Sequence, residues 1–327
     1  MADIKKLAHE VYPYVVEMRR DFHRHPEASF EEFRTTKRIA EELDKMGIPY
    51  RLFEPTGLVG EIKGGKPGKC IALRADIDAL TTTEKTGLPY ASENEGYMHA
   101  CGHDTHTAML LGAAKILSSV KDELCGTVKL IFQPAEELAS GAKCIVEQGV
   151  LDGVDAAFGQ HIFSRRPTGS LSLSEGTLHP AADYFKLTVT GKASHGALPD
   201  EGIDATVAAS AIVLALQTIS SREFSPLDPI VVTVGTLHSG ARFNIISGEA
   251  VLEGTVRIFN KDIHPHMPEI MERIAKQTAA AYRCTAELDY QFKTEILVNE
   301  PHMTAIARAE ESIAGGREVF SLGDIVH

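Results

Sequence analysis

The sequence predicts a mixed-sheet α/β protein into which a second, ferredoxin-like domain is inserted. The chain has 327 residues, more than one hydrophobic core usually holds, which favours two domains. In the first half, short apolar strands alternate with amphipathic helices, a pattern typical of layered α/β structure. From about residue 183 the predicted order becomes β-α-β-β-α-β, the order of the ferredoxin-like unit. We expect domains over 1–180 and 181–292, with 293–327 returning to the first domain.

The first domain is predicted to begin with two helices and to continue into a sheet. Apolar residues recur every three or four positions from Leu7 to Phe22, which predicts a helix that ends before Pro26. A second helix is expected over 31–46, because the same spacing continues there and Gly47 follows it. Apolar segments bounded by Gly or Pro predict two buried strands on either side of a helix. These three elements are strand 70–75, helix 105–119 and strand 127–132.

The second domain is predicted from six consecutive strands and helices. Its expected elements are strand 184–190, helix 203–220, strand 230–237, strand 249–258, helix 266–282 and strand 285–292. Residues 293–327 return to a helical pattern, although the last stretch, 315–327, has no clear period.

Composition excludes several classes of function. The net charge of -12 would repel a phosphate backbone, so we expect no nucleic-acid partner. No apolar run approaches the roughly eighteen residues of a membrane span, and the N-terminus lacks the pattern of a secretory signal. We therefore expect a cytoplasmic protein that does not enter a membrane. Five cysteines without a Cys-x-x-Cys pair predict reduced thiols.

The segment Met98–Thr107 contains three histidines, a cysteine and an aspartate. Cys101 and His103 are two positions apart, so in an extended backbone their side chains project to one side, as metal ligands would, while Gly102 allows the turn that opens the following helix. The N-terminus of the following helix would lower the thiol pKa and favour the thiolate. The alternative is that Asp104 caps this helix and the histidines are solvated. This segment alone does not decide between them.

Two further clusters follow predicted strands. Glu136 and Glu137 come directly after strand 127–132, where α/β proteins place functional groups. One could bind a metal while the other faces a water as general base, although a Glu pair is more often simply solvated. His161 lies in the apolar stretch 158–162, which is predicted to be another strand, and a lone histidine on a strand is more often a core or surface residue than a ligand. Together with Cys101 and His103, these residues form a mixed S/N/O ligand set suited to Zn²⁺, Mn²⁺ or Co²⁺.

The chain also resembles the M20 metallopeptidase family, within it the aminoacylase, hippurate-hydrolase and indole-acetyl-amino-acid hydrolase branch of amidohydrolases. The resemblance extends from about His23 to Glu311. It rests on seven segments in the family's order: Leu73–Leu80, Met98–Asp104, Phe132–Glu137, Gly159–His161, Ala193–Pro199, Phe243–Ile246 and Glu253–Arg257.

The resemblance implies cleavage of the amide bond of N-acyl amino acids at a two-metal site. It implies Glu136 as the base that activates water, and it implies these metal ligands: Cys101, His103, Glu137 and His161. Asp76 resembles an acidic residue that supports this site.

The resemblance also assigns roles to the second domain. It makes the inserted domain a lid and the contact of a homodimer, with His195 stabilising the oxyanion in the active site of the partner subunit. Asn244 and Arg257 would hold the substrate carboxylate.

The sequence departs from the family pattern at its C-terminus. A late histidine that completes the family's metal site has no counterpart here, and we do not assign His327 to that role. The chain therefore looks C-terminally truncated, and we expect an incomplete first domain with an exposed sheet edge. Three alternatives stay open: a dipeptidase with the same machinery, an inactive metal-binding or dimerising remnant, and a thiol enzyme with Cys101 as nucleophile.

Overall fold

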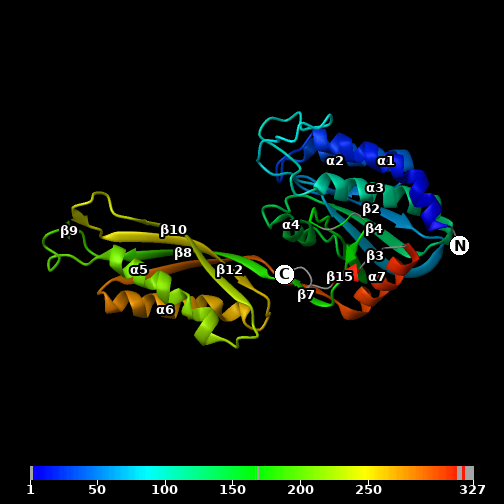
Figure 1. The fold of residues 1–327 in the computed structure, drawn as a ribbon. Coiled ribbons are helices and arrows are strands. Elements are labelled where there is room, and N and C mark those ends of the chain that lie inside the picture. Colours follow the sequence, from blue (N-terminus) through cyan, green and yellow to red (C-terminus); the bar gives the residue numbers. More distant parts are fainter. Residues whose placement is uncertain (1–2, 166, 168, 315–318, 321–327) are drawn as a thin grey trace. The chain divides into compact units, whose positions relative to one another are not determined.

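The protein folds into two compact units, shown in the computed structural model of Figure 1. The structure describes residues 3–165, 167, 169–314 and 319–320. The first unit ends near residue 168, and the second contains the described residues from 169 onward. Whether 181–292 is an insertion and 293–327 rejoins the first domain stays a prediction.

The first unit is built on a five-stranded mixed sheet in the order β1-β2-β4-β3-β5. Its strands are β1 (Tyr50–Leu52), β2 (Leu58–Lys63), β3 (Lys66–Asp76), β4 (Cys125–Gln133) and β5 (Ala156–Gly159). Strand β3 runs parallel to both β4 and β5, whereas β2 is antiparallel to β1 and β4. This arrangement confirms the predicted mixed-sheet α/β class.

Helices cover both faces of this sheet (Figure 1). They are α1 (Ile4–Arg24), α2 (Phe33–Met46), α3 (His103–Ser119), the 3-10 turn η1 (Lys121–Glu123) and α4 (Gly141–Glu147). Leu130 and Phe132 of β4 pack in one core with α1, α2 and α3. Ile131, which points to the other face, packs with Ile145 of α4. This alternation is what a strand buried on both faces requires.

The second unit is dominated by a four-stranded antiparallel sheet in the order β10-β12-β8-β13. Its strands are β8 (Ala181–Thr190), β10 (Ile230–Ser239), β12 (Glu249–Ile258) and β13 (Thr285–Thr294). Helices α5 (Ala205–Leu216) and α6 (Met267–Ala281) pack on the sheet through one continuous apolar core (Figure 1). The order β8-α5-β10-β12-α6-β13 is the predicted β-α-β-β-α-β.

Smaller elements complete the second unit. Three two-stranded ladders join β6 (Leu171–Ser172) to β15 (Val319–Phe320), β7 (Gly176–His179) to β14 (Leu297–Asn299), and β9 (Ser194–His195) to β11 (Ile245–Ile246). The remaining helical elements are η2 (Ile219–Glu223), η3 (His264–His266) and α7 (Pro301–Ala314). None of the helices in the described part of the chain has both the length and the apolarity that crossing a bilayer demands.

Predicted and observed elements differ mainly where elements are short. Gly47 ends α2 in the left-handed conformation, as predicted. Strand β2 and the seven-residue helix α4 were not predicted. Gly60 and Glu61 interrupt the apolar residues of β2, and α4 is too short to show a clear helical period. Part of the predicted helical return is instead strand β14. Residues 315–318 and 321–327, including His327, lie outside the described residues.

Candidate metal centre

The polar residues singled out in the first unit meet at one edge of its sheet. Parallel strands β3, β4 and β5 end side by side there, since Asp76 pairs with Gln133 and Arg74 pairs with Gly159. Glu136 and Glu137 follow the end of β4, His161 follows the end of β5, and α3 begins at His103. This edge, the carboxyl end of the parallel strands, is where open α/β sheets bind ligands.

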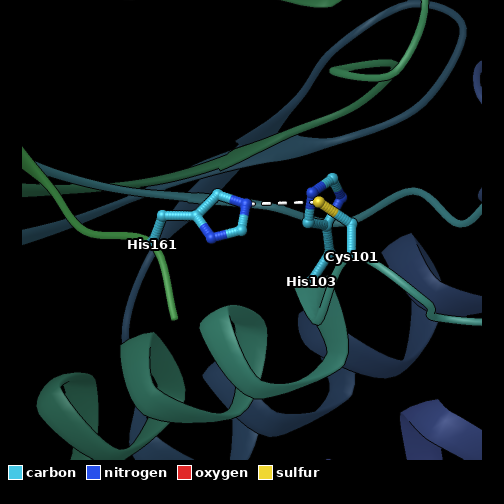
Figure 2. A group of neighbouring side chains, drawn as sticks. All are labelled: Cys101, His103 and His161. Atoms are coloured by element: carbon cyan, nitrogen blue, oxygen red, sulfur yellow. Dashed lines mark hydrogen bonds between the residues drawn. The ribbon is translucent and has the colours of Figure 1, made fainter. Parts of the chain in front are cut away.

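The five predicted residues lie within reach of one another. Cys101 Sγ is 3.2 Å from His161 Nε2, and both side chains approach His103 (Figure 2). His103 Nε2 is 3.8 Å from Glu136 Oε2 and 3.9 Å from Glu137 Oε1. Two groups share His103, Cys101–His103–His161 and His103–Glu136–Glu137, and in each group the potential ligand atoms lie within 4.8 Å of one another. These distances are short enough for divalent ions to be shared.

His103 presents one nitrogen to this cluster. Its Nδ1 lies 2.9 Å from the carbonyl oxygen of Asp78 and 3.2 Å from Asp78 Oδ1, so Nδ1 carries the proton and donates it. Its Nε2 is buried and lacks a hydrogen-bond partner among the described residues, as does Glu137 Oε1. Because buried polar atoms rarely stay unpartnered, these two orphan atoms suit metal ligation, and the donor set fits a metal centre.

Gly102 shapes the approach of Cys101 to α3. It adopts a φ of +96° as the N-cap residue, and a Cβ there would lie 2.4 Å from the Ile162 side chain. Gly102 thus provides the turn that we expected to open the helix, although the backbone at Gly102 itself is not extended. Asp104 does not cap the helix; it is buried inside the first turn, 2.8 Å from His23 Nδ1 and 2.9 Å from Arg19 Nε.

The turn that carries the two glutamates is held by two buried carboxylates that the sequence did not indicate. Ala135 has a φ of +49°, and its N–H donates to Glu32 Oε1 at 2.8 Å. The N–H of Glu137 donates to Asp78 Oδ2 at 3.0 Å. Glu32 and Asp78 both have no exposed surface. Glu32 lies more than one hundred positions from Ala135 in the chain, and no spacing pattern could have revealed this contact.

Charges within the cluster shift several pKa values. Burial opposes protonation of His103, but its hydrogen bond to Asp78 and the neighbouring Cys101 thiol outweigh it and raise its pKa to about 11. The neighbouring His103 and the hydrogen bond to His161 lower the pKa of the Cys101 thiol. Burial raises the pKa of Glu137. The surroundings of His103 thus favour a positive charge at this position. In the free protein a proton on His103 provides that charge, and a bound cation would provide it instead.

Asp76, predicted to support the site, is buried at the end of β3. Its Oδ2 accepts from Arg74 Nη1 at 2.7 Å and lies 3.6 Å from His103 Nε2. Despite burial, which raises it, the pKa of Asp76 is held low by a hydrogen bond from His106 and by Arg74. Asp76 is therefore an anion beside the candidate ligands.

The remaining predicted residues lie in the second unit. His195 of β9 pairs with Ile245 of β11, and Gly196 N–H donates to Asn244 O at 2.9 Å, so His195 and Asn244 are neighbours. Both are exposed. Arg257 lies near the far end of β12, about 25 Å along that strand from its start beside this ladder.

A thiol, imidazoles and carboxylates at the strand ends of an α/β sheet define a metal-binding hydrolase. Residues 72–320 match the model described as peptidase family M20/M25/M40, which is well over half of the chain. The chain belongs to this family, as the resemblance implied.

Three similar proteins illustrate the relationship. An N-acetylcysteine deacetylase of Bacillus subtilis is 44% identical over 281 residues, 84% of this chain and 73% of the relative. An N-acyl-L-amino acid amidohydrolase of Geobacillus stearothermophilus is 39% identical over 300 residues, 91% of this chain and 81% of the relative. The crystal structure of a Bacillus subtilis protein, described as a dinuclear metal-binding peptidase of the M20 family, has a TM-score of 0.85 and 38% identity, covering 96% of this chain and 83% of that one.

Proposed function

We propose that this protein is a metal-dependent amidohydrolase that cleaves the amide bond of N-acyl amino acids. One observation carries the proposal. Cys101, His103, Glu137 and His161 converge with Glu136 around two buried ligand atoms that have no hydrogen-bond partner among the described residues. The N-acyl amino acid substrate is supported by relatives named as a deacetylase of N-acetylcysteine and an amidohydrolase of N-acyl amino acids. A cytoplasmic location, expected from the sequence, stays a prediction.

We assign the metal ligands to Cys101, His103, Glu137 and His161, which would hold two divalent ions. When bound, such ions polarise an amide carbonyl and acidify a water. Zn²⁺, Mn²⁺ and Co²⁺ are the candidates, since a thiolate with imidazoles and a carboxylate suits borderline ions.

We assign the general base to Glu136. Its side chain is 41% exposed, whereas that of Glu137 is 21% exposed, so Glu136 is the better placed of the pair to meet water and substrate. Its carboxylate would take a proton from water and pass it to the leaving amine nitrogen. Because neighbouring side chains point in different directions, Glu137 can bind a metal while Glu136 keeps this role.

We propose that the active form is a homodimer in which the second unit acts as the lid. His195 would stabilise the developing oxyanion, and Asn244 and Arg257 would bind the substrate carboxylate. The separation of Arg257 from the β9–β11 ladder along β12 supports a site to which two chains contribute, because one small carboxylate cannot touch both ends of a strand. Mixing a Glu136→Gln chain with a His195→Ala chain should restore activity, and failure of that rescue would favour a site within one chain.

The proposed function is tested by metal content measured beside hydrolysis. Elemental analysis should find two divalent ions per chain, and N-acetyl and N-benzoyl amino acids should be hydrolysed in preference to unblocked dipeptides. Preference for dipeptides would identify a dipeptidase with the same machinery. One ion or none, without turnover of either substrate, would identify a binding or dimerising remnant.

A thiol enzyme is the second candidate, favoured by the 3.2 Å contact between Cys101 Sγ and His161 Nε2. Chelation separates the two chemistries. The amidohydrolase should lose activity on chelation and regain it when Zn²⁺, Mn²⁺ or Co²⁺ is returned. A thiol enzyme should keep its activity on chelation and lose it irreversibly on alkylation.

A further inference from the structure

His106 lies against the candidate metal centre but uses both ring nitrogens elsewhere. It is buried in the first turn of α3, and its Nδ1 lies 2.6 Å from Asp76 Oδ1. Its Nε2 accepts the backbone N–H of Ile162 at 2.9 Å. Because Nε2 accepts, Nδ1 must carry the proton and donate it to Asp76. The surroundings of the ring thus fix a single tautomer.

The Ile162 residue connects His106 to the candidate ligand His161. While the N–H of Ile162 donates to His106, its carbonyl oxygen accepts from His161 Nδ1 at 2.5 Å. His161 therefore carries its proton on Nδ1 and directs Nε2 toward Cys101 (Figure 2). A continuous chain of hydrogen bonds runs from Asp76 through His106 and Ile162 to His161.

The His106 ring also packs on both candidate histidine ligands. It stacks on His103 with 5.5 Å between ring centroids and an interplanar angle of 29°. It meets His161 edge-on, with 4.7 Å between centroids and an angle of 74°. His103 belongs to α3 and His161 follows β5, so one side chain braces ligands from two separate elements.

We propose that His106 is a positioning residue that sets the orientation and tautomer of His161 and so raises metal affinity, without binding metal itself. This inference rests on the proposed metal-dependent function. Asp76, His103 and His106 do bring ligand atoms within 4.8 Å of one another, which makes His106 a possible ligand by distance alone. The geometry opposes ligation, because a metal at either nitrogen would displace Asp76 or the Ile162 N–H.

Two amide substitutions separate the two hydrogen bonds of His106. In His106→Gln the side-chain oxygen reaches about as far as Nε2 and can still accept from Ile162, but the contact with Asp76 is lost. In His106→Asn the side-chain amide reaches about as far as Nδ1 and can still donate to Asp76, but Ile162 loses its acceptor. His106→Phe keeps the ring packing and loses both hydrogen bonds.

The experiment is titration of each metal-free protein with Co²⁺, followed by the thiolate-to-cobalt absorption of Cys101 and by the bound stoichiometry. We expect the Asn and Phe variants to bind Co²⁺ about 10–100-fold more weakly, the range typical when a partner of a metal ligand is removed. The Gln variant should lie closer to wild type. All three should keep the wild-type stoichiometry. The matched control is His264→Gln, which removes a buried histidine bonded at 2.8 Å to buried Asp183 in the second unit and should leave Co²⁺ affinity unchanged.

The outcomes separate this inference from the proposed function. If every variant binds one equivalent of Co²⁺ less than the wild type, His106 is itself a metal ligand. If the Asn and Phe variants bind Co²⁺ with wild-type affinity, His106 has no positioning role. Wild-type protein that binds no Co²⁺ would instead overturn the metal-dependent function itself. Nitrogen NMR of the metal-free wild type needs no variant: His106 should be protonated at Nδ1 alone, and an Nε2–H tautomer would contradict the inference.

Discussion

Each unit buries an aspartate–histidine network, and the two networks differ in what they leave unsatisfied. In the second unit, Asp183 accepts from His264 at 2.8 Å, from the Tyr290 hydroxyl at 2.6 Å and from the Lys293 N–H at 3.3 Å. None of these groups has an unpartnered buried side-chain atom in the part of the chain that the structure describes.

In the first unit, His103 Nδ1 donates to the carbonyl oxygen of Asp78 at 2.9 Å and lies 3.2 Å from its carboxylate, but His103 Nε2 has no hydrogen-bond partner among the residues that the structure describes. A network in which every polar atom has a partner stabilises the core and fixes its conformation. A network of the same residue types that leaves a buried polar atom without a partner can bind a ligand at that atom. Residue types alone therefore do not distinguish a structural network from a functional one.

The largest effect should come from Glu136→Gln, which tests whether the more exposed of the two glutamates acts in catalysis and not in metal binding. Loss of the proposed base should lower kcat about 10²–10⁴-fold, while both metals should remain bound because none of the proposed ligands is removed. Elemental analysis of the variant beside its kinetics measures both quantities. Loss of metal would exchange the roles of Glu136 and Glu137, for which Glu137→Gln is the paired control.

Added metal should stabilise the network around Asp78 and His103 in the first unit and not the network around Asp183 in the second unit. At a free concentration one hundred times the Kd, a metal that binds only the folded protein adds about 2.7 kcal/mol to the free energy of unfolding. Hydrogen exchange read by mass spectrometry should show added protection in peptides of α3 and of the segment after β4. Peptides of β8 and β13 around Asp183 serve as the internal control. Equal protection of both sets would mean that metal binding is not localised to the first unit.

The sequence predicted the long elements and the residues of the candidate site, but not the groups that hold those residues. Cys101 and His103 could be found because ligand-type side chains are dense at 98–107, whereas Glu136, Glu137 and His161 follow or lie in predicted strands. The resemblance to the M20 family joined them into one site. Glu32 and Asp78 could not be found, because their role depends on tertiary contacts with Ala135 and Glu137.

Acidic residues are usually exposed, so nothing local distinguishes a buried anchor from a solvated carboxylate. The turn at Gly102 could be expected, but not its tertiary contact: a Cβ at this position would lie 2.4 Å from the Ile162 side chain, some sixty positions away in the chain.

Glu32→Ala removes such a buried anchor and should have a smaller effect, on both stability and kcat. It leaves the Ala135 N–H and the Thr56 hydroxyl without their acceptor in a buried site, which costs about 1–3 kcal/mol of folding free energy. The turn should also relax from its positive φ, so kcat should fall more than KM rises. Glu32→Gln can still accept from Ala135 and should recover most of both losses. If Gln is as damaging as Ala, the hydrogen bond to Ala135 is not what holds the turn.

The smallest effect should come from an exposed pair in the second unit. Arg273 Nη2 lies 2.6 Å from Glu223 Oε2, a shorter contact than most in the candidate metal centre, but Arg273 is about half exposed. Water and salt screen such a pair, so Arg273→Ala should change the free energy of unfolding by less than about 1 kcal/mol and leave metal affinity unchanged. Urea denaturation at low and high salt measures the change. A loss of unfolding free energy larger than this, and equal at both salt concentrations, would show that a short distance matters more than burial. That result would contradict the comparison of the two networks, in which burial decides.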